Sequence, residues 1–263
     1  MLTGKVSYGS AMDQIYIPKK RKGLPVGSLV LIEEINPQLK INPYYHNLNY
    51  LEPIKDEIIK SIFHFMNSEE NIIITGSFLE PGFQFEDIDI IVFGNALGLK
   101  EFVLSNFGIH AHIIQIRKND FLKGINTDPL YQMIVSQFIS KERFIFEINN
   151  EYNFKLLDLA LVKSELLITN FEITSGQEKY KLLRNTFAIK RFLEHKEISK
   201  DFLEKDIEYY FSKGFLKDFQ KNLISLKDFR KKFEKLYESI SSQIMNGIKE
   251  QEKTLKNYSR KSE

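Results

Sequence analysis

Two spacings of apolar residues divide the chain into predicted strands and helices. Apolar residues alternate with polar ones, or form short runs, in segments that predict strands over residues 5–35, 72–74, 87–93, 109–116 and 143–148. Apolar residues recur three and four positions apart in segments that predict helices over residues 53–66, 97–107, 128–139 and 155–168. Strands and helices intermixed in this order predict an α/β fold with a mixed sheet.

The first fifty residues predict a small β unit followed by a connector. Pro18, Pro25 and Gly27 interrupt the apolar runs of residues 5–35, as expected for short strands and turns. The order of strand, Ile-Pro, the basic stretch KKRK, a turn and VGSLVLI resembles one chain of the AbrB-like swapped-hairpin DNA-binding fold. A hairpin packed on the main domain is the alternative. Residues 36–51 are rich in Pro, Asn and aromatic residues and predict an extended connector.

The last third of the chain is predicted to be helical throughout. Candidate helices cover residues 176–195, 199–211, 214–223 and 226–250, and the polar tail after about residue 250 is expected to fray. The predicted domains are therefore a β unit and connector at 1–50, a core at 51–170 and a helical domain at 171–263.

Composition excludes several classes of protein. Of 263 residues, 43% are hydrophobic and 27% charged, as in globular proteins, and the absence of cysteine excludes disulfides, thiolate metal sites and cysteine nucleophiles. The longest apolar runs are shorter than the roughly 18 residues of a membrane span, and the N-terminus lacks the pattern of a secretion signal. We therefore expect a cytoplasmic protein with no membrane partner.

Charge is distributed unevenly although the net charge is only +2. Residues 176–263 contain 21 Lys and Arg against 14 Asp and Glu, whereas residues 1–175 contain 16 basic and 21 acidic residues. A basic region of this kind can face RNA or DNA, and it can equally be the solvated surface of lysine-rich helices.

Residues 71–93 contain the most informative pattern. Asp87 and Asp89 are two positions apart in a predicted strand, so both side chains project from the same face. Two adjacent carboxylates repel each other unless a cation lies between them, and oxygen ligands suit Mg²⁺ or Mn²⁺. Gly76 and Ser77 follow another apolar strand, and a turn of this type presents backbone N–H groups and a hydroxyl that can bind phosphate.

This segment resembles the signature of the DNA polymerase β nucleotidyltransferase superfamily. In both, an apolar strand is followed by Gly-Ser, then by about ten residues and then by a strand that begins with the pattern seen here as Asp-Ile-Asp-Ile. The resemblance covers residues 71–116 and extends loosely to residue 148. It implies a mixed-sheet nucleotidyltransferase core, with Asp87 and Asp89 as metal ligands and catalytic residues and with Gly76 and Ser77 binding the phosphates of a nucleoside triphosphate. The basic C-terminal region resembles the helical substrate domains often attached to such cores.

The third carboxylate of the superfamily is missing from its usual place. Alternation in residues 109–116 puts His110, His112 and Ile114 on one face, and the family pattern places His112 where the aspartate would stand. An imidazole can bind metal or act as a base near pH 7 but adds no negative charge. Two histidines on a polar strand face are the alternative, and Asp120 and Asp158 are candidates for a substitute carboxylate.

Tyr180, Lys181 and Arg184 lie in the first helix of the C-terminal domain. By position, they could face the cleft, and Lys181 and Arg184 are candidates for binding the triphosphate.

Three functions remain open from the sequence. The first is metal-dependent transfer of a nucleoside monophosphate from a nucleoside triphosphate to an acceptor hydroxyl. The second is a catalytically degenerate protein that keeps the fold and binds nucleotide or nucleic acid, and the third is an antitoxin or regulatory partner of another protein. The absence of GxxxxGK[ST] and GxGxxG excludes a P-loop and gives no support to a dinucleotide fold.

Overall fold

The computed structural model describes residues 5–7, 14–16, 41–66 and 71–259, and it divides the chain into two compact units, residues 1–40 and 41–263. In the first unit, β1 (Lys5–Ser7) pairs antiparallel with β2 (Gln14–Tyr16). This pair lies within the segment for which the sequence predicts a β unit. Residues 17–40, which carry the KKRK stretch and the rest of the proposed swapped-hairpin pattern, lie outside the described residues.

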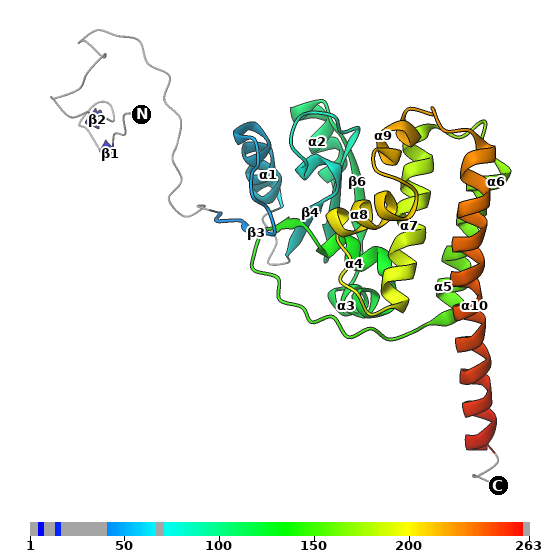
Figure 1. Cartoon of the computed structure of the whole chain (residues 1–263). Coiled ribbons are helices and arrows are strands. Elements are labelled where there is room, and N and C mark those ends of the chain that lie inside the picture. The colour runs from blue at the N-terminus through cyan, green and yellow to red at the C-terminus, as the bar shows by residue number, and fades with distance from the viewer. Residues whose placement is uncertain (1–4, 8–13, 17–40, 67–70, 260–263) are drawn as a thin grey trace. The chain divides into compact units, whose positions relative to one another are not determined.

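The second unit is built on a five-stranded mixed sheet (Figure 1). Its strands are β3 (Tyr44–His46), β4 (Ile72–Thr75), β5 (Asp87–Val92), β6 (His110–Gln115) and β7 (Phe138–Ser140). The order across the sheet is β3-β7-β4-β5-β6, with β5 and β6 parallel and the other neighbours antiparallel. The predicted mixed α/β class is confirmed.

Helices cover both faces of this sheet. On one face, α1 (Pro53–Phe65) and α2 (Leu99–Phe107) pack on the buried side chains of Ile72, Ile74 and Ile90. On the other face, α3 (Lys118–Thr127) and α4 (Pro129–Val135) contribute to a core that includes Ile73 and Ile91. Successive strand residues point to opposite faces, so continuous isoleucine runs are what a sheet buried on both sides requires.

Several predicted elements differ from the structure. Residues 143–148, predicted as a strand, form no regular element, and residues 138 and 139, predicted as the end of a helix, belong to β7 instead. Helix α4 begins at Pro129 behind the Asp128 cap and ends at Val135, which leaves Phe138 and Ile139 free to fill the position between β3 and β4. Within the predicted connector, residues 44–46 form the edge strand β3 of the main sheet.

The remaining helices form an all-helical layer with its own aromatic core. They are α5 (Phe154–Val162), the 3₁₀ turn η3 (Lys163–Glu165), α6 (Leu166–Thr169), α7 (Gly176–Leu193), α8 (Lys200–Tyr210), α9 (Phe215–Gln220) and α10 (Leu226–Ser259). Phe211, Phe215 and Phe229 stack within this core. Helix α10 continues to Ser259, beyond the predicted fraying point near residue 250. Within the described part of the chain, no helix is both long and apolar enough to cross a membrane.

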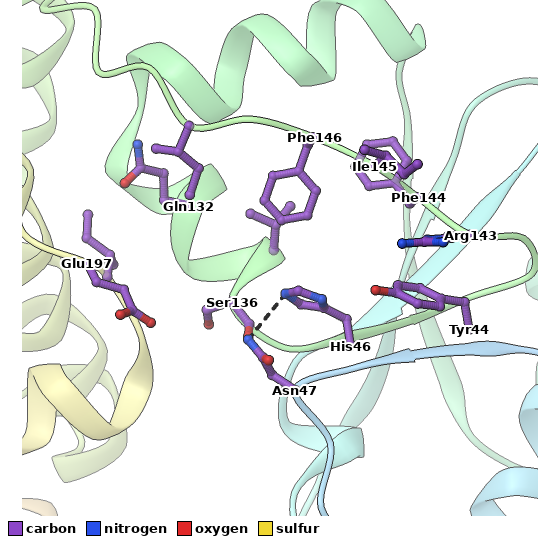
Figure 2. Close-up of a pocket in the computed structure, with 13 residues that line it drawn as sticks. Tyr44, His46, Asn47, Gln132, Ser136, Arg143, Phe144, Ile145, Phe146 and Glu197 are labelled. Atoms are coloured by element: carbon purple, nitrogen blue, oxygen red, sulfur yellow. Dashed lines mark hydrogen bonds between the residues drawn. The ribbon is translucent and has the colours of Figure 1, made fainter.

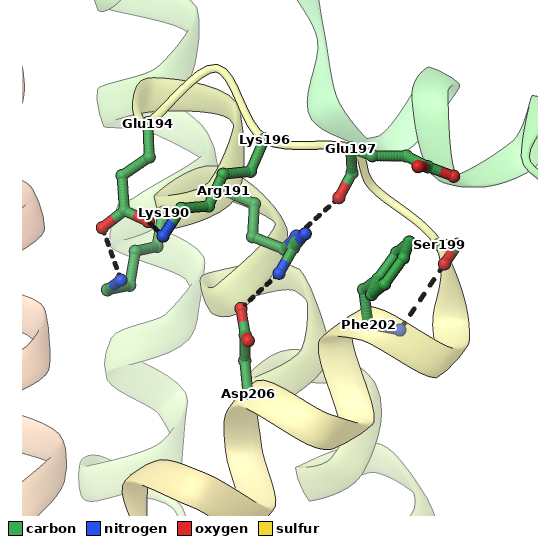
Figure 3. Close-up of polar contacts among 8 residues, drawn as sticks. All are labelled: Lys190, Arg191, Glu194, Lys196, Glu197, Ser199, Phe202 and Asp206. Atoms are coloured by element: carbon green, nitrogen blue, oxygen red, sulfur yellow. Dashed lines mark hydrogen bonds and ion pairs between the residues drawn. The ribbon is translucent and has the colours of Figure 1, made fainter.

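A buried arginine braces the turn between α7 and α8 (Figure 3). Arg191 is only 8% exposed. Its Nε donates to the Glu197 carbonyl at 2.5 Å, and its Nη1 donates to Asp206 Oδ2 at 2.7 Å. The guanidinium also lies 5.0 Å from the centre of the Phe202 ring. The brace joins the end of α7, the turn and α8, the two helices whose side chains reach the cleft described below.

We expect Arg191→Ala to lower the free energy of unfolding by about 2 kcal/mol, because Asp206 and the Glu197 carbonyl both lose a charged donor. Urea denaturation followed by circular dichroism measures this change. Lys196→Ala is the control, since the Lys196 side chain is 55% exposed in its pair with Glu194. An equal effect of the two substitutions would show that Arg191 does not brace the turn.

Candidate active site

The two aspartates of β5 share one face of the sheet. Asp87 and Asp89 are partly exposed, whereas Ile88 and Ile90 between and after them are fully buried on the opposite face. Both carboxylates line a cavity of about 400 Å³ that also includes Gly76 and Ser77. The structure therefore brings the Asp-Ile-Asp and Gly-Ser segments together in one cleft.

Gly76 lies against the Asp89 carboxylate. Its φ is +84°, a left-handed value that favours glycine, and a Cβ at this position would lie 2.1 Å from Asp89 Oδ2. The chain then turns into the 3₁₀ segment η2 (Ser77–Leu79), and the backbone N–H of Glu80 donates to the Ser77 carbonyl at 3.1 Å. Ser77 is exposed at the mouth of the cleft. Glycine is thus required here both by the backbone and by the neighbouring carboxylate.

Lys55 anchors the turn that follows Ser77 through a hydrogen bond to the backbone. This lysine of α1 is completely buried, and its Nζ donates to the Glu80 carbonyl at 2.6 Å and pairs with Glu52 Oε2 at 3.0 Å. The ammonium lies within 6 Å of the ring centres of Phe78, Phe83 and Phe85. These contacts fix the backbone that presents Ser77 to the cleft.

His112 enters the same cleft from β6. The parallel register places it beside Asp89, and its Nδ1 lies 2.9 Å from Asp89 Oδ1. The His112 side chain is 60% exposed and lines the cleft. The ring that carries the second nitrogen, Nε2, is therefore accessible from the cleft. His110, two residues earlier, pairs with Asp87 in the register but does not line the cavity.

The substitute carboxylates suggested by the sequence lie elsewhere. Asp120 is on α3, where Arg117 Nε donates to it at 2.6 Å, and Asp158 is on α5. Neither lines the cleft. Of the candidates for the third position, only His112 lies beside the aspartate pair.

Three basic side chains close the cleft from the helical layer. Lys181 and Arg184 project from α7 and Lys200 from the first position of α8. The Nε of Arg184 is buried and has no hydrogen-bond partner among the described residues, and its guanidinium lies 5.5 Å from the centre of the Tyr180 ring. Tyr180 does not line the cleft. Burial and a hydrogen bond to Glu204 raise the pKa of Tyr180 above its usual range, so the ring beneath Arg184 is an uncharged phenol.

The cleft also contains Lys200, Glu80 and Thr75, which belong to none of the motifs described above. Lys200 Nζ pairs with Glu80 Oε1 at 2.5 Å, which ties α8 to the turn that follows Ser77. Thr75 Oγ1 donates to the carbonyls of Ile134 and Gln137 at 3.0 and 3.1 Å and holds the end of α4 beside the cleft. The only sequence signal for Lys200 is its place after Ser199, the N-cap of a predicted helix.

The aspartate pair offers part of the ligand set that a divalent cation needs. Among the residues that the structure describes, no group of three or more His, Asp or Glu side chains is arranged to hold a metal ion. Asp87 and Asp89 offer carboxylate oxygens on one face, and Mg²⁺ is commonly held by one or two carboxylates with substrate phosphates and water completing its ligands. The pair therefore fits a cation that arrives with a phosphorylated ligand.

We expect Gly76→Ala to distort the cleft and to lower stability more than Gly82→Ala. Both glycines have left-handed φ values, +84° and +87°, but a Cβ at Gly82 would meet nothing within 4 Å. The comparison separates backbone strain, which both variants suffer, from displacement of Asp89, which only Gly76→Ala causes. Thermal unfolding and metal-dependent nucleotide binding should be measured on both, and equal losses would show that the contact with Asp89 is unimportant.

Comparison of the chain with models of protein families, with curated proteins and with solved structures gives no match.

Proposed function

We propose that this protein is a metal-dependent nucleotidyltransferase, which moves a nucleoside monophosphate from a nucleoside triphosphate to an acceptor hydroxyl. The observation that carries the proposal is the composition of one cleft. Asp87 and Asp89 lie on one wall with Gly76 and Ser77, and three basic side chains lie on the other. A polyphosphate with a cation satisfies both walls, because the cation neutralises the carboxylates and the phosphates neutralise the basic groups.

The buried Nε of Arg184 supports a bound anion. A buried donor without a partner is costly, and a phosphate oxygen is a strong acceptor for a guanidinium. Lys181 is exposed beside it, and Lys200 is already paired with Glu80. Arg184 and Lys181 are therefore the residues that we assign to the triphosphate, with the Ser77 hydroxyl at its other end.

In the proposed reaction, the acceptor oxygen forms a bond to the α-phosphorus. The bond from that phosphorus to the oxygen bridging to the β-phosphate breaks, and pyrophosphate leaves with the electron pair. A Mg²⁺ or Mn²⁺ ion held by Asp87 and Asp89 would offset the negative charge that develops on the phosphates. His112 Nδ1–H donates to Asp89 Oδ1 in the tautomer that leaves Nε2 unprotonated, and Nε2 then takes the acceptor proton.

A second function is favoured by one specific observation, the histidine in place of a carboxylate beside Asp89. A site with two carboxylates and an imidazole has less negative charge than one with three carboxylates, and it holds Mg²⁺ less tightly. The second candidate is therefore a degenerate protein that binds nucleotide or nucleic acid without turnover, including one that acts as an antitoxin or regulatory partner. Its basic region at residues 176–263 would provide the contacts to RNA or DNA.

Incubation of the full chain with each labelled nucleoside triphosphate and Mg²⁺ or Mn²⁺ tests the proposal. We expect release of pyrophosphate with transfer of label to RNA, to a small acceptor or to the protein itself. Binding of nucleotide without pyrophosphate release would favour the second candidate. The absence of metal-dependent nucleotide binding would reject both nucleotide functions of the cleft.

A further inference from the structure

A second cavity of about 410 Å³ adjoins the candidate active site (Figure 2). Ser136, directly after α4, lines both cavities. The turn between α7 and α8 also connects them, because Glu197 and Ile198 line the second cavity whereas Lys200 lines the first. The two cavities are therefore neighbours along the same boundary between the sheet and the helical layer.

Two aromatic side chains, His46 and Phe146, form a platform on the wall of the second cavity, and the buried Phe138 lies behind it. The His46 ring stacks on the Phe138 ring, with centroids 4.7 Å apart and an angle of 23° between the planes. The His46 and Phe146 rings meet in an edge arrangement, with centroids 5.7 Å apart. Burial lowers the pKa of His46, which favours the neutral form of its ring. Figure 2 shows the His46 ring close to Asn47 and Ser136.

Polar groups surround this platform. Asn47 Nδ2 donates to the Ser136 carbonyl at 3.0 Å, which leaves the Asn47 carbonyl oxygen as an acceptor at the cavity wall. Arg143 is exposed at the other end and forms no ion pair among the described residues. Aromatic surface bounded by a few amide and guanidinium groups is the usual composition of a site for a planar polar ligand.

Strand register places the platform relative to the aspartates. His46 is paired with Phe138, Thr75 with Asp89 and Asp89 with His112, all on the sheet face that is covered by α3 and α4. Strand β3 is three strands from β5 in the order of the sheet, which corresponds to about 14 Å at the usual spacing of strands. His112 lies on the opposite side of Asp89, on β6.

We propose that the His46 cavity holds the base of the nucleoside triphosphate whose phosphates bind in the Asp87–Asp89 cleft. This inference rests on the proposed function and adds the site that selects the base. The acceptor hydroxyl must approach the proton-accepting nitrogen of His112, so the acceptor occupies the β6 side of the cleft. The donor nucleotide then extends toward β7 and β3, where the aromatic platform lies on a strand about 14 Å from β5.

The test compares ligands with and without a base. Titration calorimetry on the full chain, in Mg²⁺, measures binding of the four ribonucleoside triphosphates and of inorganic tripolyphosphate. His46→Leu keeps the volume of the side chain but removes the stacking ring, and we expect it to weaken the tightest nucleotide by about fivefold to a hundredfold, the range for stacking of one base on an aromatic ring. Tripolyphosphate binding should be unchanged. His64→Leu, at an exposed position of α1 outside both cavities, is the matched control and should change neither ligand.

Each outcome decides the assignment. Equal weakening of nucleotide and tripolyphosphate by His46→Leu, or no weakening of either, overturns it while leaving the proposed function in place. Loss of binding to a short RNA oligonucleotide with unchanged nucleotide binding also overturns it, since the cavity would then belong to the acceptor. If the wild-type protein shows no metal-dependent binding of any triphosphate, the proposed function is rejected, and the base site that rests on it is rejected with it. Phe146→Leu provides the same comparison if His46→Leu does not fold.

Discussion

Asp89→Asn is expected to weaken metal-dependent nucleotide binding by about a hundredfold, whereas Ser77→Ala should weaken it by about fivefold. Asparagine keeps the shape of the side chain against Gly76 but removes a negative charge that offsets the cation. The lost Ser77 hydroxyl removes one neutral hydrogen bond, worth about 1 kcal/mol. Calorimetry with and without Mg²⁺ measures both effects.

Asp120→Asn is the matched control for this experiment. Asp120 also accepts a short hydrogen bond at the surface, from Arg117, but lies outside the cleft, so its substitution should leave nucleotide affinity unchanged. Equal binding by wild type and Asp89→Asn, or affinity that does not depend on divalent metal, would contradict the assignment of the aspartate pair.

The part of the site that is local in sequence could be predicted from the sequence. A period of two along β5 places Asp87 and Asp89 on one face without knowledge of any other element. Gly76 and Ser77 follow β4, which pairs directly with β5 through Thr75 and Asp89, so a short connection brings the two segments together. The expectation that Lys181 and Arg184 face the cleft matches the observed lining of the cavity, although their role in binding remains a prediction.

The parts that depend on distant pairing could not be predicted. Phe138 and Ile139 continue a helical pattern in the sequence, and only pairing with β3 and β4 makes them a strand. The apolar spacing of residues 143–148 fits a strand equally well, but these residues have no ladder partner, and Phe144 fills the core instead. His46 and Lys200 reach the cavities only because β3 joins the sheet and the α7–α8 turn folds back, and neither event has a signal in the local sequence.

Substitution of His112 distinguishes the two proposed functions, a nucleotidyltransferase and a degenerate binding protein. We expect it to have the largest effect on turnover. If the protein is an enzyme, His112→Ala should abolish pyrophosphate release, by at least about a hundredfold, because general base catalysis and the hydrogen bond to Asp89 are both lost. Mn²⁺ should support a faster reaction than Mg²⁺, since an imidazole near the ion favours later transition metals. His110→Ala is the control, because His110 is on the same strand but outside the cleft.

A second substitution, His112→Asp, also distinguishes the two functions, because it adds a carboxylate instead of removing the imidazole alone. If wild type binds nucleotide without releasing pyrophosphate, His112→Asp places a third carboxylate beside Asp89 on the adjacent parallel strand and should bring tighter Mg²⁺ binding with measurable turnover. In an active wild type, the same change should shift the preference from Mn²⁺ toward Mg²⁺. Turnover that is unaffected by both His112→Ala and His112→Asp would exclude His112 from proton transfer, because its position beside Asp89 would then have no consequence for the reaction.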